Sequence, residues 1–142
     1  MKRRTEFYTY EEIAKIGQRY YNDNNFCTVV AMTHAAKVGF GKVFNAYKRK
    51  GRPLGKGGWL FNNKEIQKDL GITAEKYEGG LFDYVGTVSQ VVRRLPKGAF
   101  WLLIKGHIIH VEDNVTLDWV KSNSKRRVNT IYKITRHFEQ AA

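Results

Sequence analysis

The stretch that most constrains the fold runs from residue 22 to residue 36. It opens with the polar run Asn22-Asp23-Asn24-Asn25 and becomes almost wholly apolar from Cys27 to Ala36. Asn and Asp side chains accept hydrogen bonds from the free N–H groups of a first helical turn, so the polar run predicts a helix start. The apolar residues after it predict a helix that is buried on most sides. We therefore expect one central helix that begins at about Cys27.

Cys27 is the only cysteine of the chain. In the first turn of a helix, the dipole and the unpaired N–H groups favour an anion, which lowers the pKa of a thiol and makes a nucleophilic thiolate available. A free cysteine also commonly serves as a small buried hydrophobe, so both interpretations stay open at this point. A single cysteine excludes an internal disulfide framework and suits a reducing compartment.

The composition predicts one globular domain that covers residues 1–142. The chain is 42% hydrophobic and long enough to bury one core. Its formal net charge of +12 favours an anionic partner such as nucleic acid or an acidic protein. The N-terminal residues lead into no apolar segment and no stretch approaches the length of a membrane span, so we expect neither a secretory signal nor a membrane partner.

The order of the predicted elements indicates an α+β fold in which helices precede an antiparallel sheet. Capping-box patterns at Thr9 and Thr87 and the pair Asn62-Asn63 mark helix starts. From Ala99 onward, short apolar or alternating runs replace the helical period. The expected helices cover about 9–21, 27–39, 42–50, 62–70 and 87–95, and the expected strands cover 100–104, 107–112, 115–119 and 128–134, with a further short strand left open within 72–80.

Two of these strands bring a histidine and a carboxylate together. If Asp113-Asn114 is a two-residue hairpin turn, paired positions follow from it, and Ile109 lies opposite Asp118. His107 and Asp118 then share one face of the hairpin as diagonal neighbours, roughly 7–8 Å apart at the backbone, while His110 lies on the other face. A histidine ring can meet a carboxylate across that distance.

Cys27, His107 and Asp118 together predict a catalytic triad if the helix packs on the sheet. A carboxylate that accepts a hydrogen bond from one imidazole nitrogen fixes the tautomer, which leaves the other nitrogen as the base for the nucleophile. The backbone N–H of Cys27 can supply one donor of an oxyanion hole. The candidates for the second donor are the side-chain amides of Gln18, Asn22, Asn24 and Asn25.

The other histidines predict no further chemistry. His34 lies seven helical residues from Cys27, a rise of about 10 Å, so it is expected to be a core or helix-packing residue. His110 is expected in solvent or in a second layer, and His137 in a tail. Four scattered histidines and one cysteine do not form a zinc-site spacing, so we expect no metal and no cofactor.

The order of cysteine, histidine and aspartate resembles that of papain-like cysteine peptidases. More narrowly, the stretch 25–31, Asn-Phe-Cys-Thr-Val-Val-Ala, is similar to an Asn-Asp-Cys-Val-Val-Arg-Ala motif of small papain-like proteins from bacteriophages and bacteria. Gly51-Arg52 and Gly57-Gly58 resemble the glycine-containing loop that follows the third helix in those proteins. The stretch 106–119 resembles their Gly-His hairpin, which ends in aspartate.

This resemblance implies a papain-like fold, with the nucleophile helix packed on the C-terminal sheet, and a thiol hydrolase with Cys27, His107 and Asp118 in the three roles. Asn25, and then Asn22, match the position of the oxyanion-hole side chain best. The sequence departs from the family at Tyr21, where papain-like enzymes usually carry a glutamine, and at Phe26, where the narrower motif has aspartate.

Two classes of function are therefore expected. The first is a cysteine protease, isopeptidase or amidase, expected from the resemblance to be encoded by a bacteriophage, which acts on a protein or peptide in the host cytoplasm or in the virion. The second is a non-catalytic basic binding or virion structural protein with the same fold. Its anionic partner would be nucleic acid or an acidic protein, bound by basic clusters such as 48–56 and 121–127.

Overall fold

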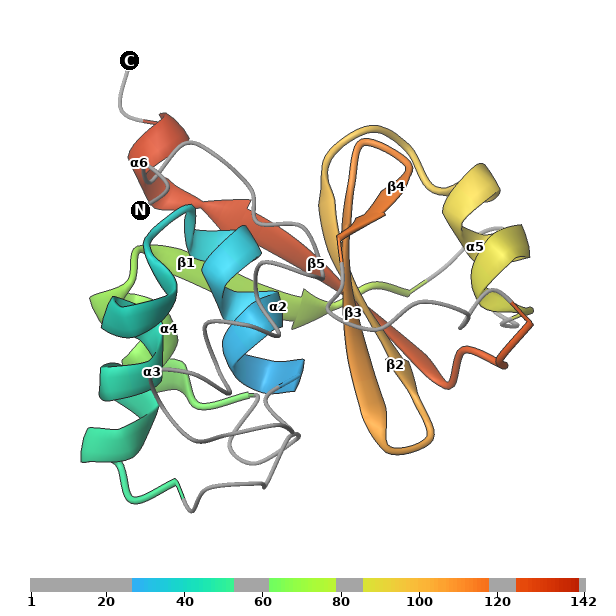
Figure 1. Cartoon of the computed structure of the whole chain (residues 1–142). Helices are drawn as coiled ribbons and strands as arrows, with labels where there is room; N and C mark the ends of the chain where they lie inside the picture. The colour runs from blue at the N-terminus through green and yellow to red at the C-terminus, as the bar shows by residue number, and fades with distance from the viewer. Residues whose placement is uncertain (1–26, 53–61, 79–85, 118–124, 141–142) are drawn as a thin grey trace.

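The computed structural model describes residues 27–52, 62–78, 86–117 and 125–140. They form an α+β structure around a five-stranded antiparallel sheet of order β1-β5-β2-β3-β4 (Figure 1), which confirms the predicted class. The predicted helix over 9–21 and the side chains of Asn22, Asn25 and Asp118 lie outside these ranges. The elements are α2 (Cys27–Ala36), α3 (Phe40–Arg49), α4 (Lys64–Asp69), β1 (Ile72–Lys76), α5 (Val88–Arg94), β2 (Ala99–Ile104), β3 (His107–Glu112), β4 (Val115–Leu117), β5 (Thr130–Arg136) and α6 (His137–Gln140).

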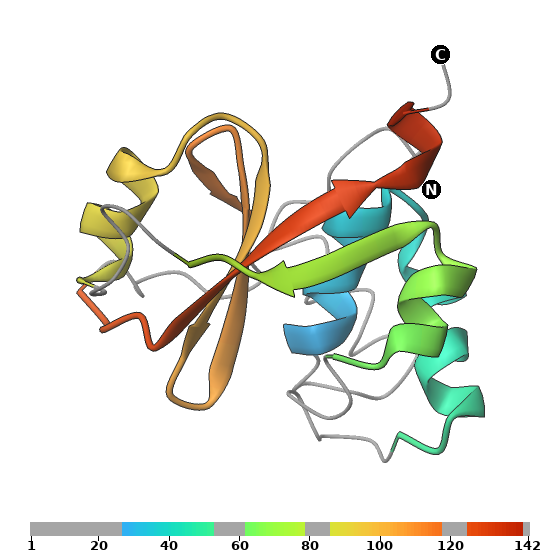
Figure 2. The ribbon, with the colours of Figure 1, turned by 180° about the vertical axis from the view of Figure 1, so that it is seen from behind.

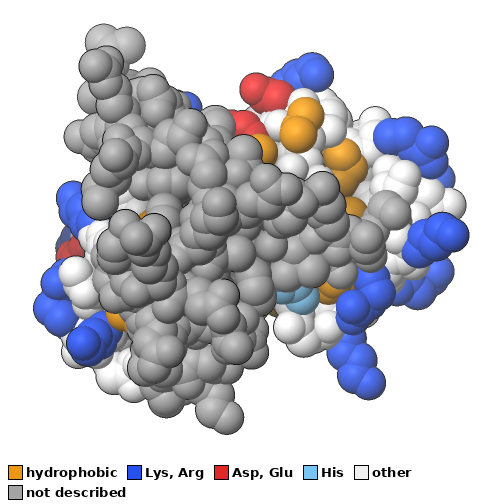
Figure 3. Space-filling view, in the orientation of Figure 1, with side chains coloured by type: hydrophobic (Ala, Val, Ile, Leu, Met, Phe, Trp, Pro, Cys, Tyr) orange, Lys and Arg blue, Asp and Glu red, His pale blue; other side chains and the backbone are white. Residues whose placement is uncertain are grey.

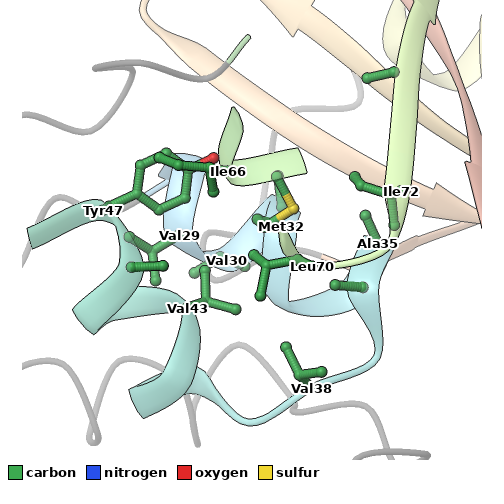
Figure 4. Packing of buried hydrophobic residues seen from close by; sticks show 14 of the residues in the cluster. Val29, Val30, Met32, Ala35, Val38, Val43, Tyr47, Ile66, Leu70 and Ile72 are labelled. Atoms are coloured by element: carbon green, nitrogen blue, oxygen red, sulfur yellow. The ribbon is translucent and has the colours of Figure 1, made fainter. Parts of the chain in front are cut away.

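Helix α2 is the centre of the fold. Every side chain from Thr28 to Ala36 is buried, which agrees with the apolar stretch. Figures 1 and 2 show α2 between the sheet and the pair formed by α3 and α4. Figure 4 shows how the cluster packs: Val29, Val30, Met32 and Ala35 of α2 lie among Val43 and Tyr47 of α3, Ile66 of α4, Leu70 and Ile72.

Two of the predicted helix starts have the side-chain caps that the sequence indicates. The Asn63 side chain accepts a hydrogen bond from the Ile66 N–H at the start of α4. At α5, the Thr87 hydroxyl accepts from the Gln90 N–H while the Gln90 side chain accepts from the Thr87 N–H, a complete capping box. Helix α4 contacts β1 and contributes to the core around α2, whereas α5 belongs to the core on the other face of the sheet.

The sheet separates two apolar cores. On the α2 face, Trp101, Ile108 and Ile134 join the core around α2, and the Trp101 Nε1–H donates to the Ala31 carbonyl over 3.2 Å. On the other face, α5 covers the strands. The residues of this second core are Val88, Val91, Leu95, Phe100, Leu102, Ile104, Ile109, Val111, Val128 and Ile131. Successive residues of β2 and β3 therefore point into different cores.

Strand β5 lies inside the sheet, between β1 and β2. The sequence predicts this strand over 128–134, but it runs from Thr130 to Arg136. Val128 is fully buried in the α5 core and its N–H donates to the Gly86 carbonyl, outside the sheet. The apolar alternation therefore starts two residues before the strand because the approach to it is buried as well.

Candidate functional site

The proposed nucleophile lies at the first described residue of α2. The described part of the helix begins at Cys27, and the polar run that predicts a helix start lies before the described residues. The structure describes the backbone of Cys27 but not its thiol, and the next side chain, Thr28, is buried. A helix that starts here, as the sequence predicts, would have free N–H groups and a partial positive charge in its first turn. Such a start would suit the stabilisation of an anion.

The hairpin that carries the predicted histidine has the expected register. Glu112 pairs with Val115 and His110 with Leu117, so Asp113-Asn114 is a two-residue turn, and both of its residues have positive φ. This confirms the turn. The same register, continued by one pair, would place Asp118 opposite Ile109, but Asp118 is beyond the described part of β4.

His107 is the first residue of β3, and its pairing fixes its face of the sheet. It lies opposite Ile104 of β2, whose side chain belongs to the α5 core. In an antiparallel pair, directly opposite residues point to the same side. Alternation along β3 agrees, because Ile109 also points into the α5 core. His107 is partly exposed and lies on the face away from α2.

Helix α2, which carries Cys27, packs along strand β3, which carries His107. The two elements run side by side in the same direction (Figure 1), and the rings of His34 and His110 stack with centroids 5.8 Å apart. Cys27 precedes His34 by seven helical residues, a rise of about 10 Å. His107 precedes His110 by three strand residues, also about 10 Å. From their shared contact, the two elements therefore extend by similar lengths toward Cys27 and His107.

On the α2 face, the structure brings together a different group of polar side chains, which we call the buried quartet: His34, His110, Glu112 and Arg136. Both histidine side chains are fully buried. His110 Nε2 lies 2.8 Å from Glu112 Oε1. The Arg136 guanidinium binds Glu112 with both ends, Nη2 to Oε1 at 2.6 Å and Nη1 to Oε2 at 2.9 Å.

Arg136 also joins this group to the end of α2. Its Nε donates to the Ala35 carbonyl over 2.7 Å and its Nη2 to the His34 carbonyl over 3.1 Å. These carbonyls belong to the last turn of α2, which lacks intrahelical donors. Arg136 of β5 and Glu112 of β3 thereby fix the C-terminal end of α2 against two strands.

Burial keeps both histidines neutral. It lowers the pKa of His34 to about 3, helped by the neighbouring His110. Burial also lowers the pKa of His110, although its hydrogen bond to Glu112 acts in the opposite direction. Because an ionised carboxylate only accepts, His110 Nε2 carries the proton toward Glu112. The Nδ1 atom of His110 is buried and has no hydrogen-bond partner among the described residues.

Glu112 is the anionic member of the quartet. Partial burial would raise its pKa, but the hydrogen bonds from Arg136 and His110 outweigh that effect and lower the pKa to about 2. Its two oxygens are fully engaged by these donors. In this arrangement Glu112 and the α2 core fix the position of the His110 ring.

The prediction that His34 is a core residue is confirmed, whereas the quartet is not predicted from the sequence. The solvent-exposed alternative for His110 is wrong, because the side chain is fully buried under α2. One signal was available: His110 and Glu112 are two residues apart on one strand, so they share a face. Arg136 is not predictable in this role, since its partners come from distant segments.

The described ranges contain neither a metal-binding cluster nor a membrane-spanning helix. No group of three or more His, Cys, Asp or Glu side chains there is arranged to hold a metal ion. None of the helices in those ranges combines the length and apolar character needed to cross a bilayer.

Comparison with protein-family models, with curated proteins and with solved structures gives no match for this chain. The geometry that bears on function is the packing of α2, which carries Cys27, along β3, which carries His107.

Proposed function

We propose that the protein is a papain-like thiol hydrolase in which Cys27 is the nucleophile, His107 the base and Asp118 the residue that orients the imidazole. One observation supports this most directly: the helix that carries Cys27 at its first described residue packs along the strand that starts at His107. A nucleophile at a helix start beside a histidine on an adjoining strand is the arrangement that acyl transfer requires.

The proposed reaction proceeds through an acyl-enzyme. His107 takes the thiol proton, and the thiolate of Cys27 attacks the carbonyl carbon of an amide to form a C–S bond. The oxyanion is held by the Cys27 N–H and by the side chain of Asn25 or Asn22. The C–N bond then breaks, and the amine leaves with the proton from His107. A water molecule, deprotonated by His107, hydrolyses the thioester and regenerates the thiol.

The substrate class is a protein or peptide, with a backbone amide, an isopeptide or a glutamine side chain as the bond broken. We place the activity in an infected bacterial cytoplasm or in a virion, on the strength of the Asn-Phe-Cys and Gly-His motifs alone. No cofactor takes part, because base, nucleophile and oxyanion donors are all groups of the chain.

The register of β3 adds a requirement to this mechanism. The pairing of His107 directs its side chain to the α5 face, whereas α2 lies on the other face of the sheet. The imidazole must therefore reach around the edge of β3 to approach Cys27. Within the described residues, β4 pairs with β3 only from His110 to Glu112. The described part of β4 therefore does not extend along β3 as far as His107. The imidazole would approach α2 around this edge of β3.

The same register favours a second candidate, a non-catalytic binding or virion structural protein on this fold. The histidine that does face α2 is His110, and it is held by Glu112 in a sealed interior. If His107 stays on the α5 face, the thiol has no base and Cys27 is a buried packing residue.

Alkylation of the single thiol by iodoacetamide across pH separates the two candidates. We expect a hydrolase to react with half-maximal rate well below the free-cysteine pKa of about 8.5. In His107→Ala, the pH of half-maximal alkylation rate should rise to about that value, because the imidazolium that stabilises the thiolate is lost. His137→Ala, which removes an exposed histidine elsewhere, is the matched control and should leave the profile unchanged. An ordinary or inert thiol that ignores His107→Ala favours the non-catalytic protein.

A further inference from the structure

The part of the molecule that contains α5 carries a dense set of exposed cations, which we call the basic lobe. They come from three segments far apart in sequence: the end of α5, the turn between β2 and β3, and residues 125–127. Figure 3 shows Lys and Arg side chains along the right-hand edge of the molecule, over these elements. The lobe consists of Arg93, Arg94, Lys97, Lys105, Lys125, Arg126 and Arg127, all exposed.

Hydrogen bonds join these segments into one surface. Arg126 Nη2 donates to the Lys105 carbonyl over 2.8 Å, which attaches residues 125–127 to the β2–β3 turn. The Val88 N–H donates to the Arg126 carbonyl over 2.9 Å, and Arg127 forms an antiparallel bridge with Thr87. The start of α5 is thereby fixed to the same segment, so the spacing of the cations is set by the fold.

The cations extend over the whole length of α5. Arg127 pairs beside the N-terminal end of the helix, whereas Arg93 and Arg94 occupy its last turn and Lys97 follows. A seven-residue helix is about 10 Å long. Duplex DNA carries one negative charge per roughly 1.7 Å of its axis, so a surface of this size faces several phosphates at once.

Within the described segments 86–117 and 125–129, the cations outnumber the carboxylates. The acidic residues of these segments are Glu112 and Asp113. Glu112 is bound by Arg136 on the α2 side of the sheet, and Asp113 Oδ1 accepts from the Gly98 N–H. The seven exposed cations of the basic lobe therefore give these segments an excess of positive charge.

We propose that the basic lobe binds the phosphate backbone of duplex nucleic acid without reading its sequence. The apolar residues of α5 are committed to the core, and among the described residues the large exposed hydrophobics are Val115 and Phe138, neither of them part of the lobe. Within the part of the chain that the structure describes, the lobe therefore offers charge without an aromatic stacking platform or an apolar wedge for lipid, which suits phosphates of a duplex. This binding is independent of the chemistry of Cys27.

The test is the affinity of the full chain for a 20-base-pair duplex DNA, measured by fluorescence anisotropy between about 50 and 200 mM salt. Two variants remove the same number and kind of exposed cations, one Arg and three Lys each, with circular dichroism to verify folding. The lobe variant is Arg93→Gln, Lys97→Gln, Lys105→Gln and Lys125→Gln, and the control is Lys42→Gln, Lys48→Gln, Arg49→Gln and Lys68→Gln.

We expect the lobe variant to weaken binding at least about tenfold at the lowest salt and to reduce the slope of log affinity against log salt by about 2–4. The control should bind within about threefold of the parent protein. Equal losses in both variants, or a parent affinity that salt does not change, would overturn the proposal. So would tighter binding to phosphatidylserine vesicles than to DNA. If the lobe variant does not fold, Lys105→Gln with Lys125→Gln is compared with Lys42→Gln with Lys48→Gln by the same criteria.

Discussion

At the scale of single residues, Arg136 makes the most demanding set of contacts in the described interior. Its guanidinium serves two carbonyls at the end of α2 and both oxygens of Glu112. Loss of the guanidinium leaves a largely buried carboxylate without its cation and two helix carbonyls without donors, each of which is costly in a low-dielectric interior.

We therefore expect Arg136→Met to lower the free energy of unfolding by about 3–5 kcal/mol, measured by urea denaturation at pH 7. Lys133→Met on the same strand is the control; its ammonium lies over the Phe100 ring but is exposed, so a loss of about 1 kcal/mol or less is expected. A cost for Arg136→Met as small as that for Lys133→Met would show that the quartet contributes little.

The two buried histidines make stability depend on pH. Their pKa values in the folded protein lie below the ordinary value of 6.5, and that of His34 is about 3. Between pH 6.5 and the lowered pKa values, the unfolded chain binds more protons than the folded protein does. The contribution of the histidines to stability is therefore fully present above pH 6.5 and falls as the pH falls. Glu112 acts in the same sense below pH 4.5, because its pKa is lowered to about 2. From pH 6.5 to pH 4 we expect a loss on the order of 3 kcal/mol from His34 alone.

Urea unfolding at several pH values tests this dependence. His34→Leu removes one of the groups and should flatten the fall in stability between pH 6.5 and pH 4, whatever its effect at neutral pH. His137→Leu changes an exposed histidine and should leave the slope as it is in the parent protein. Parallel curves for His34→Leu and the parent would contradict the assignment of neutral, buried histidines.

The position of a single side chain can be predicted from sequence where neighbouring residues determine it. The burial of His34 follows from its place in an apolar helix, and this prediction is confirmed. The role of Arg136 depends on α2, β3 and β5 meeting at one point, and no nearby residue indicates that meeting. An arginine in an alternating strand is also typical of an exposed position, which conceals its inward direction.

At the scale of elements, the hairpin of β3 and β4 shows how local chemistry fixes a register. Asp113 and Asn114 both adopt positive φ, which Asn and Asp tolerate better than most residues. The Asn114 side chain also donates to the Val92 and Leu95 carbonyls, which ties the turn to the end of α5. The predicted register is confirmed for this reason.

Two substitutions of Asn114 separate these contributions. Asn114→Gly keeps the backbone freedom but loses both hydrogen bonds, and we expect a cost of about 1–2 kcal/mol in thermal or urea unfolding. Asn114→Ala loses the bonds and adds the strain of a positive φ of 68°, so its cost should be larger by about 1 kcal/mol. The backbone argument fails if Ala is tolerated as well as Gly.

The place of β5 in the sheet order cannot be predicted from the pattern of its own residues. Its apolar alternation predicts a strand, but its place between β1 and β2 depends on pairing over long sequence separations. The two-residue error in its bounds has a related cause, since Val128 is buried by α5 rather than by the sheet. Caps and hairpins are encoded by neighbours, whereas sheet order is set by the packing of the whole chain.

At the scale of the whole molecule, the sheet decides which residues can meet. It divides the interior into a core around α2 and a core under α5, and each strand residue belongs to one of them. The sequence predicts that His107 and Asp118 share a face, and it gives no means of saying which face α2 covers. The described register places His107 on the α5 side, so the proposed triad depends on the approach of its ring around the edge of β3.

The central claim is that the Cys27 thiol and the His107 imidazole meet, and a crystal structure of the protein with its thiol reduced measures this directly. We expect the sulfur to lie about 3–4 Å from a His107 ring nitrogen, close enough for proton transfer. A sulfur enclosed in the apolar core around α2 and more than about 6 Å from that ring would contradict the hydrolase and leave the basic binding protein.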